Sequence, residues 1–221
     1  MKAAQTTKEK NTVYTVITAD LVHSRMMPPK EREDFFKLLK AQLKLLSVRY
    51  KFTYNIYRGD SFQAIIPHPY KGLLIALAIR YYVRTLKMVT YSKQADIRIA
   101  LGIGLVDFLK KKPEYSDGPA FHYSGTRLDE LDKGKIYLGI RTHNESINDE
   151  LHISCALLDQ LIQKTTINGA SVLYYKVLGY KEQTIAKKLK ISQSAVNQRS
   201  RDAGWSVVQL FIERYNNFKF K

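Results

Sequence analysis

The fold class follows from residues 13–20, which read VYTVITAD. The first seven residues of this run are apolar or β-branched, which is typical of a strand buried in the centre of a sheet. Asp20 ends the run. The pair Pro28-Pro29 then precedes apolar residues at helical spacing that continue to about Arg49. The sequence therefore predicts a central strand followed by a first helix.

The following segments continue an alternation of strands and helices. Phe52–Arg58 and Ser61–Pro67 predict two strands joined by a tight turn at Gly59-Asp60. Tyr70–Val89 predicts a second long helix, and Ile97–Gly104 predicts another strand. The order strand, helix, strand, strand, helix, strand is that of the ferredoxin-like βαββαβ arrangement, an antiparallel sheet with both helices on one face.

The rest of the chain predicts an extension of this unit and then a purely helical part. Ala120–Leu131 predicts a third helix, and Ile136–Leu138 predicts a short extra strand. From Asn148 onward no strand pattern returns, and Asn148 followed by acidic residues is typical of a helix start. We therefore predict an α+β chain, with a ferredoxin-like domain at residues 12–145 and an all-α domain at residues 149–221.

Composition excludes several classes of protein. Of the 221 residues, 45% are hydrophobic and 25% are charged, so the chain can build a core and is not a disordered protein. The single cysteine, Cys155, excludes a disulfide scaffold and is expected to be a buried, inert thiol. No apolar run approaches the roughly 20 residues that a membrane span needs, so we expect a cytoplasmic protein that does not bind membranes.

The charge of the chain favours polyanionic partners. There are 36 Lys and Arg against 20 Asp and Glu, a net charge of +16. Residues 165–221 hold 10 basic and 3 acidic side chains, a net +7 in 57 residues, whereas the first 164 residues hold a net +9. This density indicates that a nucleic acid would bind the C-terminal part.

Two carboxylates are expected at one edge of the sheet. Asp20 ends the first strand, and Asp60 lies in the turn that joins the second and third strands. Two carboxylates that face one space repel each other unless a cation such as Mg²⁺ lies between them. The segment after Asp20 leads into the first helix, where Ser24 and Arg25 are predicted to bind phosphate.

Four motifs in this region resemble the palm of class III nucleotidyl cyclases, and more closely the SatD-like family. They are VITADLVHSR, YRGDSFQAII, RIALGIGLV and DGPAFHYSGTRLDEL, and they occur in the family's order over roughly residues 12–140. The resemblance implies a cyclase-like fold in which Asp20 and Asp60 hold two metal ions and Arg127 stabilises the transition state. Two positions depart from the cyclase pattern, since Tyr123 replaces an asparagine and Ile56 replaces a base-selecting lysine.

A second motif lies in residues 181–204, which read KEQTIAKKLKISQSAVNQRSRDAG. Two short helices with a turn at Lys190-Ile191-Ser192 are predicted, and the pattern is similar to the helix-turn-helix of sigma factor region four and LuxR-type regulators. The second helix of such a unit enters the major groove of DNA. The predicted DNA contacts, to base edges or to phosphates, are Lys187, Lys188, Lys190, Gln193, Ser194, Asn197, Gln198, Arg199 and Arg201.

These features lead to one main interpretation and two alternatives. The main one is a DNA-binding transcriptional regulator, a homodimer on double-stranded DNA, whose first domain senses a nucleotide with Mg²⁺ or Mn²⁺ and is not an enzyme. The first alternative is a nucleotidyl cyclase-like enzyme that uses the two aspartates as metal ligands. The second is a protein-interaction module in which the helical part binds a partner protein.

Overall fold

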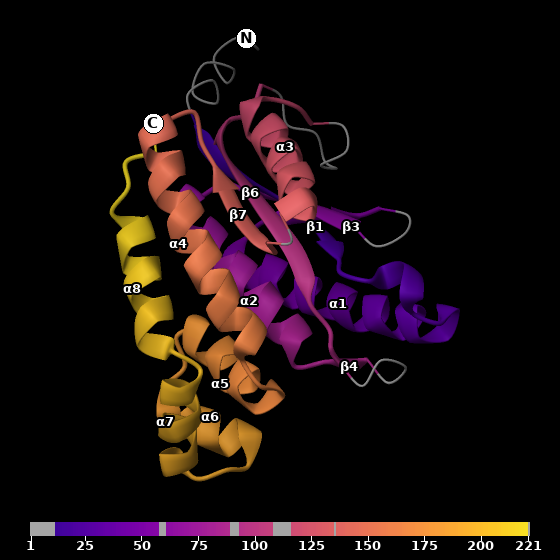
Figure 1. Ribbon diagram of the computed structural model, residues 1–221, viewed down its shortest axis with the longest axis vertical. Coiled ribbons are helices and arrows are strands. Elements are labelled where there is room, and N and C mark those ends of the chain that lie inside the picture. Colours follow the sequence, from indigo (N-terminus) through magenta and orange to yellow (C-terminus); the bar gives the residue numbers. More distant parts are fainter. Residues whose placement is uncertain (1–11, 58–60, 89–92, 108–115, 135, 221) are drawn as a thin grey trace, which may run out of the picture.

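The computed structural model describes residues 12–57, 61–88, 93–107, 116–134 and 136–220 (Figure 1). Seven strands are described among them: β1 (Val13–Leu21), β2 (Thr53–Ile56), β3 (Ser61–Ile66), β4 (Lys87–Met88), β5 (Lys93–Gln94), β6 (Ile97–Leu105) and β7 (Leu138–Arg141). The described α-helices are α1 (Pro29–Tyr50), α2 (Gly72–Arg84), α3 (Pro119–Gly134), α4 (Glu145–Lys164), α5 (Ile167–Val177), α6 (Glu182–Leu189), α7 (Gln193–Asp202) and α8 (Trp205–Asn216). No described helix is both long and apolar enough to cross a membrane.

The main sheet has five strands in the order β2-β3-β1-β6-β7. The strand β1 lies at its centre and pairs antiparallel with β3 on one side and with β6 on the other. Because Val16 and Ile17 point to opposite faces and are both fully buried, this strand requires covering layers on both sides of the sheet. The first four strands follow the ferredoxin-like order, and β7 adds a parallel edge strand beside β6. The α+β class and the ferredoxin-like sheet are confirmed.

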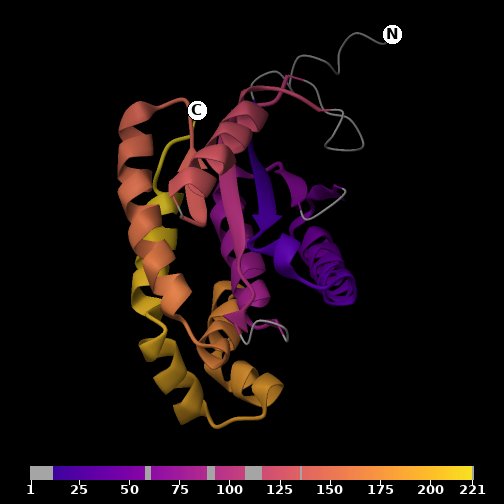
Figure 2. The same cartoon turned by 45° about the vertical axis from the view of Figure 1, so that its right-hand side comes forward.

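Helices cover both faces of this sheet (Figures 1 and 2). On one face, α1 and α2 pack on the side of β1 that carries Ile17 and Ala19, as the sequence predicts. On the other face, α3 packs on β6 and β1, where Val16 contacts Ala120. A Cβ on Gly102 would come within 2.0 Å of the Ala120 carbonyl oxygen, so the glycine allows α3 to approach the sheet closely.

The second long helix is shorter than the sequence predicts. The expected range is Tyr70–Val89, but α2 covers Gly72–Arg84. Residues Pro69–Lys71 form a short 3-10 turn before it. At the other end the Thr85 hydroxyl donates to the Tyr82 carbonyl oxygen, and the chain then enters the β4–β5 pair, which the apolar periodicity did not reveal.

The C-terminal helices share the core of the sheet. Buried side chains of α4, α5 and α8, among them Cys155, Leu173 and Phe211, belong to the same apolar cluster as those of β1 and α2. Helices α6 and α7 close a small cluster of their own on α5. The apolar core is therefore continuous across residue 145, where a domain boundary is predicted, and a distinct helix-turn-helix domain is not supported. The division at residues 12–145 and 149–221 stays a prediction.

A buried ionic network fixes α4 to α2. The guanidinium of Arg80 is completely buried, donates two hydrogen bonds of 2.9 and 3.0 Å to Asp96, and lies 2.5 Å from a carboxylate oxygen of Asp159. Arg84 donates to the carbonyl oxygens of Gln163 and Thr165 at the end of α4. Burial alone would lower the pKa of Arg80, but the two carboxylates outweigh it and raise the pKa above its ordinary value. The network therefore holds α4 in one position.

The Cys155 thiol is expected to be unreactive toward thiol reagents in the folded protein. Its side chain is fully buried in α4, and burial raises the pKa of its thiol to about 12. Because the thiolate is the reactive form, a thiol reagent at pH 8 should modify less than about a tenth of the folded protein in an hour. In guanidinium chloride, modification should reach one equivalent within minutes. A fast reaction of the native protein, followed by absorbance, would contradict this burial.

Candidate functional site

The end of β1 places the first predicted metal ligand. Asp20 is paired in register with Ser61 on β3 and with Arg98 on β6. Since Ser61 directly follows Asp60 in the chain, the register brings the neighbour of the second predicted ligand beside Asp20. Asp60 itself lies outside the described residues. The end of β1 therefore lies beside the start of β3, as the sequence predicts, and the description of β3 begins at Ser61.

The carboxylate of Asp20 has an arginine partner. Arg98 donates from Nε and Nη2 to the two Asp20 oxygens at 2.9 and 2.6 Å, a two-pronged ion pair in which both side chains are about one-fifth exposed. Arg98 also pairs through Nη1 with Asp132 near the end of α3. The guanidinium thus links β1, β6 and α3 at this edge. These two hydrogen bonds hold the Asp20 side chain at this edge of the sheet.

Sequence analysis missed Arg98 as a site residue. The available signal is a single arginine in the otherwise apolar strand IRIALGIG at residues 97–104. A charged side chain in such a strand needs a partner of opposite charge, and the partner is on the neighbouring strand. Only the register between β1 and β6 shows that this partner is Asp20.

The predicted phosphate-binding residues follow β1 in a short 3-10 turn (Ser24–Met26). His23, before the turn, has a left-handed conformation with φ of 60°. The side chain of Ser24 is buried, whereas that of Arg25 is exposed to solvent. Arg25 therefore has the freedom to contact a bound phosphate, and Ser24 stabilises the turn. Phosphate binding by either residue stays a prediction.

Arg127 lies elsewhere on α3. Its side chain crosses β7, where a Cβ on Gly139 would come within 2.5 Å of its Nε atom. Its terminal nitrogens bond Glu130 at 2.9 Å and the Nδ1 atom of His152 at 2.8 Å. These groups line a polar cavity of about 200 Å³ between α3, β7 and α4. Among the described contacts, none joins Arg127 to Asp20, and Arg127 bonds Glu130 and His152 instead.

The two departures from the cyclase pattern have structural roles. The Tyr123 ring lies on α3 over Gly104 of β6, where a Cβ would come within 3.2 Å of it. Ile56 ends the edge strand β2 and lines an open cavity of about 710 Å³ with polar residues of α1, such as Lys37 and Lys40. Both side chains thus pack on the sheet or beside it, and neither supplies the amide or ammonium group of a cyclase.

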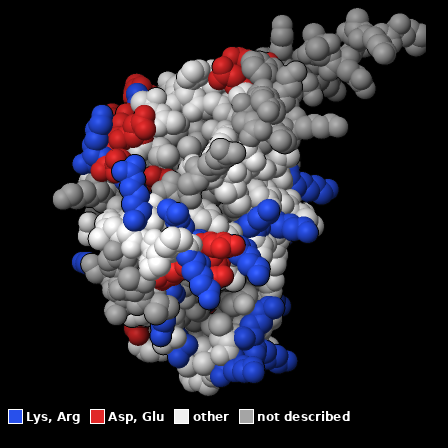
Figure 3. Space-filling model, turned by 90° about the vertical axis from the view of Figure 1, so that its right-hand side faces the viewer, with Lys and Arg blue, Asp and Glu red and all other residues white. Residues whose placement is uncertain are grey.

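The helices α6 and α7 have the predicted order, with a turn at Lys190, but many of their polar groups are already bound. Glu182 accepts hydrogen bonds from Lys176, Gln193 and Asn197, and the Lys176 bond is the main reason why the pKa of Glu182 is lowered. Basic side chains gather at this lower end of the molecule (Figure 3). The ammonium of Lys188 lies over two tyrosine rings of the same region.

Several other polar side chains at α7 bond one another. Arg201 donates to Gln198, and Gln198 donates to Asp202 at 2.8 Å. The Ser192 hydroxyl caps the helix by accepting from the Ala195 amide, and it also contacts Ser194. Most of the proposed base-reading groups therefore have partners within the chain.

Comparison with known proteins gives structural likeness only. No family model and no curated protein matches the sequence. One similar solved structure is the catalytic core of a rhodopsin-guanylyl cyclase in complex with ATPalphaS, at 18% identity over 54% of this chain and 72% of that one, with a TM-score of 0.44. A second is the GGDEF domain of DgcB from Caulobacter crescentus in complex with c-di-GMP, at 13% identity over 59% and 78%, with a TM-score of 0.46. A third is a bacterial light-regulated adenylyl cyclase, at 11% identity over 58% and 75%, with a TM-score of 0.44.

These comparisons correct the main interpretation of the sequence. Two of the three matched structures are named as cyclases, and none of the three is named as a DNA-binding regulator. The prediction of a DNA-binding transcriptional regulator that is not an enzyme is therefore corrected in favour of its cyclase-like alternative. The nine residues predicted to contact DNA are not tested by these comparisons and stay predictions. The narrower resemblances to SatD-like proteins and to sigma factor or LuxR-type helices have no matching family model. The ferredoxin-like order of the first four strands is the part of the predicted fold that the structure shows.

Proposed function

We propose that this chain is a nucleotidyl cyclase-like enzyme that acts on a nucleoside triphosphate at the end of β1. The observation that carries the proposal is the register of the central strands, in which Asp20 lies opposite Ser61, the residue after Asp60. Asp60 comes directly before Ser61 in the chain, so two carboxylates would be available to a single ligand at this edge. The likeness to cyclase domains supports the fold but adds no residue to the site.

The residues present fit a hard divalent cation. Carboxylate oxygens are the ligands that Mg²⁺ and Mn²⁺ prefer, and Asp20 with Asp60 would hold the ion at the sheet edge. The ion would neutralise charge on the triphosphate when bound. The two-pronged bond from Arg98 holds the Asp20 carboxylate at this edge, where a metal ion would compete with Arg98 for its oxygens.

The chain's own residues have distinct roles in this proposal. In a cyclisation the ribose 3′ oxygen bonds to the α-phosphorus while the bond to the pyrophosphate oxygen breaks, and the hydroxyl proton leaves to a base or water. Arg98 holds the Asp20 carboxylate at the sheet edge through its ion pair, and Arg25 on the exposed turn would bind phosphate oxygens. Arg127 is bound to Glu130 and His152, so the proposal does not depend on it.

The test is direct analysis of nucleotide turnover. Purified protein is incubated with ATP or GTP and with Mg²⁺ or Mn²⁺, and the products are separated by chromatography and identified by mass. Formation of a cyclic or condensed nucleotide together with pyrophosphate supports the proposal. Unchanged nucleotides with both metals, together with no binding of either triphosphate by calorimetry, would overturn it.

Arg98→Gln should raise the affinity of the protein for Mn²⁺ without nucleotide by about tenfold. In the wild type, Mn²⁺ must displace the Arg98 guanidinium from the Asp20 carboxylate before it can bind. Removing this competitor, which is worth roughly 1–2 kcal/mol, corresponds to about tenfold in affinity. Turnover should fall in the same variant, because Asp20 loses the partner that orients its carboxylate. Arg141→Gln is the matched control, since Arg141 lies on the adjacent strand β7 and bonds Glu130 instead. Equal Mn²⁺ affinity in all three proteins, measured by electron paramagnetic resonance, would contradict a metal site at Asp20.

A further inference from the structure

Four exposed apolar side chains lie on two neighbouring helices of the C-terminal part. Ile153 and Leu157 on α4 are 63% and 67% exposed, and Val207 and Leu210 on α8 are 51% and 66% exposed. The spacings i, i+4 on α4 and i, i+3 on α8 place each pair on one face of its helix. The opposite faces of both helices are buried in the main core, so these outer faces are a second apolar surface.

The pairing of α4 with α8 brings the four side chains together. The two helices lie side by side (Figures 1 and 2), and two contacts set their antiparallel register. Near one end Arg214 makes a two-pronged ion pair with Glu150, and near the other the backbone at Gly204 lies against the Leu161 side chain. Interpolation between these contacts puts Leu157 beside Val207 and Ile153 beside Leu210. We call this group of four residues the α4–α8 patch.

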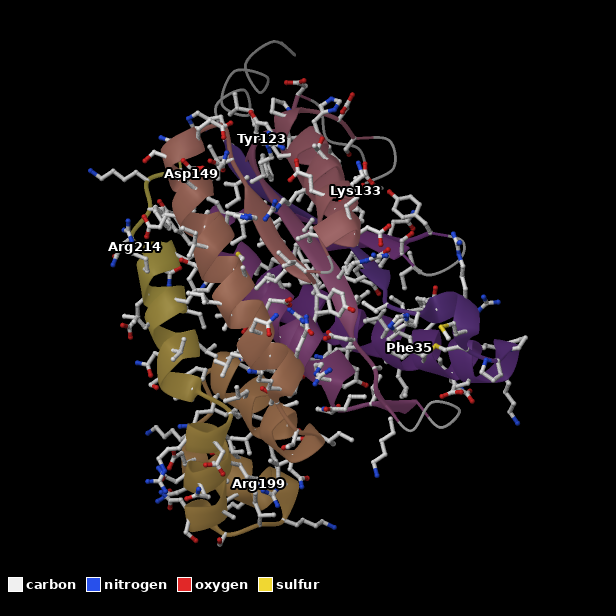
Figure 4. The ribbon with its side chains drawn as sticks, in the orientation of Figure 1. Phe35, Tyr123, Lys133, Asp149, Arg199 and Arg214 are labelled. Carbon is white, nitrogen blue, oxygen red and sulfur yellow. The ribbon has the colours of Figure 1, made fainter. Side chains whose placement is uncertain are left out.

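The two ends of the patch carry opposite charge. The end at the start of α4 and the end of α8 holds the acidic residues Asp149, Glu150 and Glu213, with Arg214 paired to Glu150 and Lys219 nearby. The other end holds Lys164 on α4 and, at the end of the adjoining α7, Arg201 beside Asp202. Figure 4 shows Asp149 and Arg214 at one end of the helix pair and Arg199, on α7, beyond the other. A surface with an apolar centre, an acidic end and a basic end is complementary to itself after a half-turn.

We propose that the α4–α8 patch binds a second copy of this chain about a two-fold axis, forming an antiparallel four-helix contact. The half-turn lays the acidic end of one copy on the basic end of the other, which offsets the repulsion between two chains of net charge +16. Helix α4 has 20 residues and α8 has 12, so their outer faces can bury on the order of 500 Å² of surface per copy. A total near 1,000 Å² is at the lower limit for a specific interface, so a micromolar dimer is expected.

Sedimentation velocity of the full chain, measured over a range of concentrations, tests the proposal. The wild type should change from monomer to dimer between about 1 and 100 µM. Leu157→Glu and Leu210→Glu, one on each helix, should each weaken the association by at least about tenfold, because each buries a charge in the apolar centre. Both side chains are mostly exposed in the single chain, so the variants should keep the wild-type melting temperature when they are measured as monomers.

Val48→Glu is the matched control. Val48 is 75% exposed on α1, far from the patch in the chain, and its replacement should leave the dimer unchanged. A wild type that stays monomeric up to about 100 µM would overturn the proposal and leave the patch to another partner. A dimer that survives both Leu157→Glu and Leu210→Glu would also overturn it. Turnover is not a readout in this experiment, so failure of this proposal is distinct from failure of the proposed enzyme activity.

Discussion

Asp60→Asn and Asp20→Asn should each lower nucleotide turnover by at least about 100-fold. Asparagine keeps the size of the side chain but removes the negative charge that holds a divalent cation, and the loss of a metal-linked transition-state interaction has at least this magnitude. The measurement is the initial rate of product formation from ATP and from GTP at saturating Mn²⁺. The fall should appear in kcat, because Asp20 and Asp60 would hold an ion that stabilises charge on the reacting phosphate.

A control variant separates this effect from general damage. Asp129→Asn changes an exposed carboxylate on α3 that has no described ion pair, and its turnover should equal that of the wild type. Asp20→Asn also loses its ion pair with Arg98, so its melting temperature is compared with that of Arg98→Gln, which loses the same pair. Full activity of either aspartate variant would show that the product is formed elsewhere.

Arg80→Met should destabilise the fold by about 3–5 kcal/mol. Removing one partner from a buried ion pair leaves the other charge uncompensated, and here Asp96 and Asp159 would both lose their main cation. In a chain of this size the melting temperature should fall by roughly 10–15 °C. Chemical unfolding followed by circular dichroism gives the free energy, and differential scanning calorimetry gives the temperature.

Two further variants test whether the uncompensated buried carboxylates cause this loss of stability. Replacing Arg80 together with Asp96 and Asp159 by apolar residues of similar volume should recover part of the lost stability, because no buried charge remains. Glu150→Gln removes an exposed ion pair with Arg214 and should leave the unfolding midpoint unchanged. If Arg80→Met changes stability no more than Glu150→Gln does, the network does not hold α4 to α2.

The sequence predicts the elements better than their arrangement. The apolar run at residues 13–19, the turn residues Gly59-Asp60 and the helical periodicities indicate the order of strands and helices because these patterns depend on neighbours along the chain. The face on which α3 lies was not predicted, because it depends on the close approach that Gly102 allows. The β4–β5 pair was also missed, because two-residue strands carry no periodicity.

Some features of the candidate site were also predictable from the sequence, and others were not. The sequence alone determined that this chain has an α+β sheet with acidic residues at the end of its central strand and before Ser61. Only the tertiary structure decided that Arg98 binds Asp20, that Arg127 bonds Glu130 and His152, and that the C-terminal helices share the core of the sheet. The physical reason is range: local patterns specify the conformation of each segment, whereas charge pairing and burial depend on residues that only folding brings together.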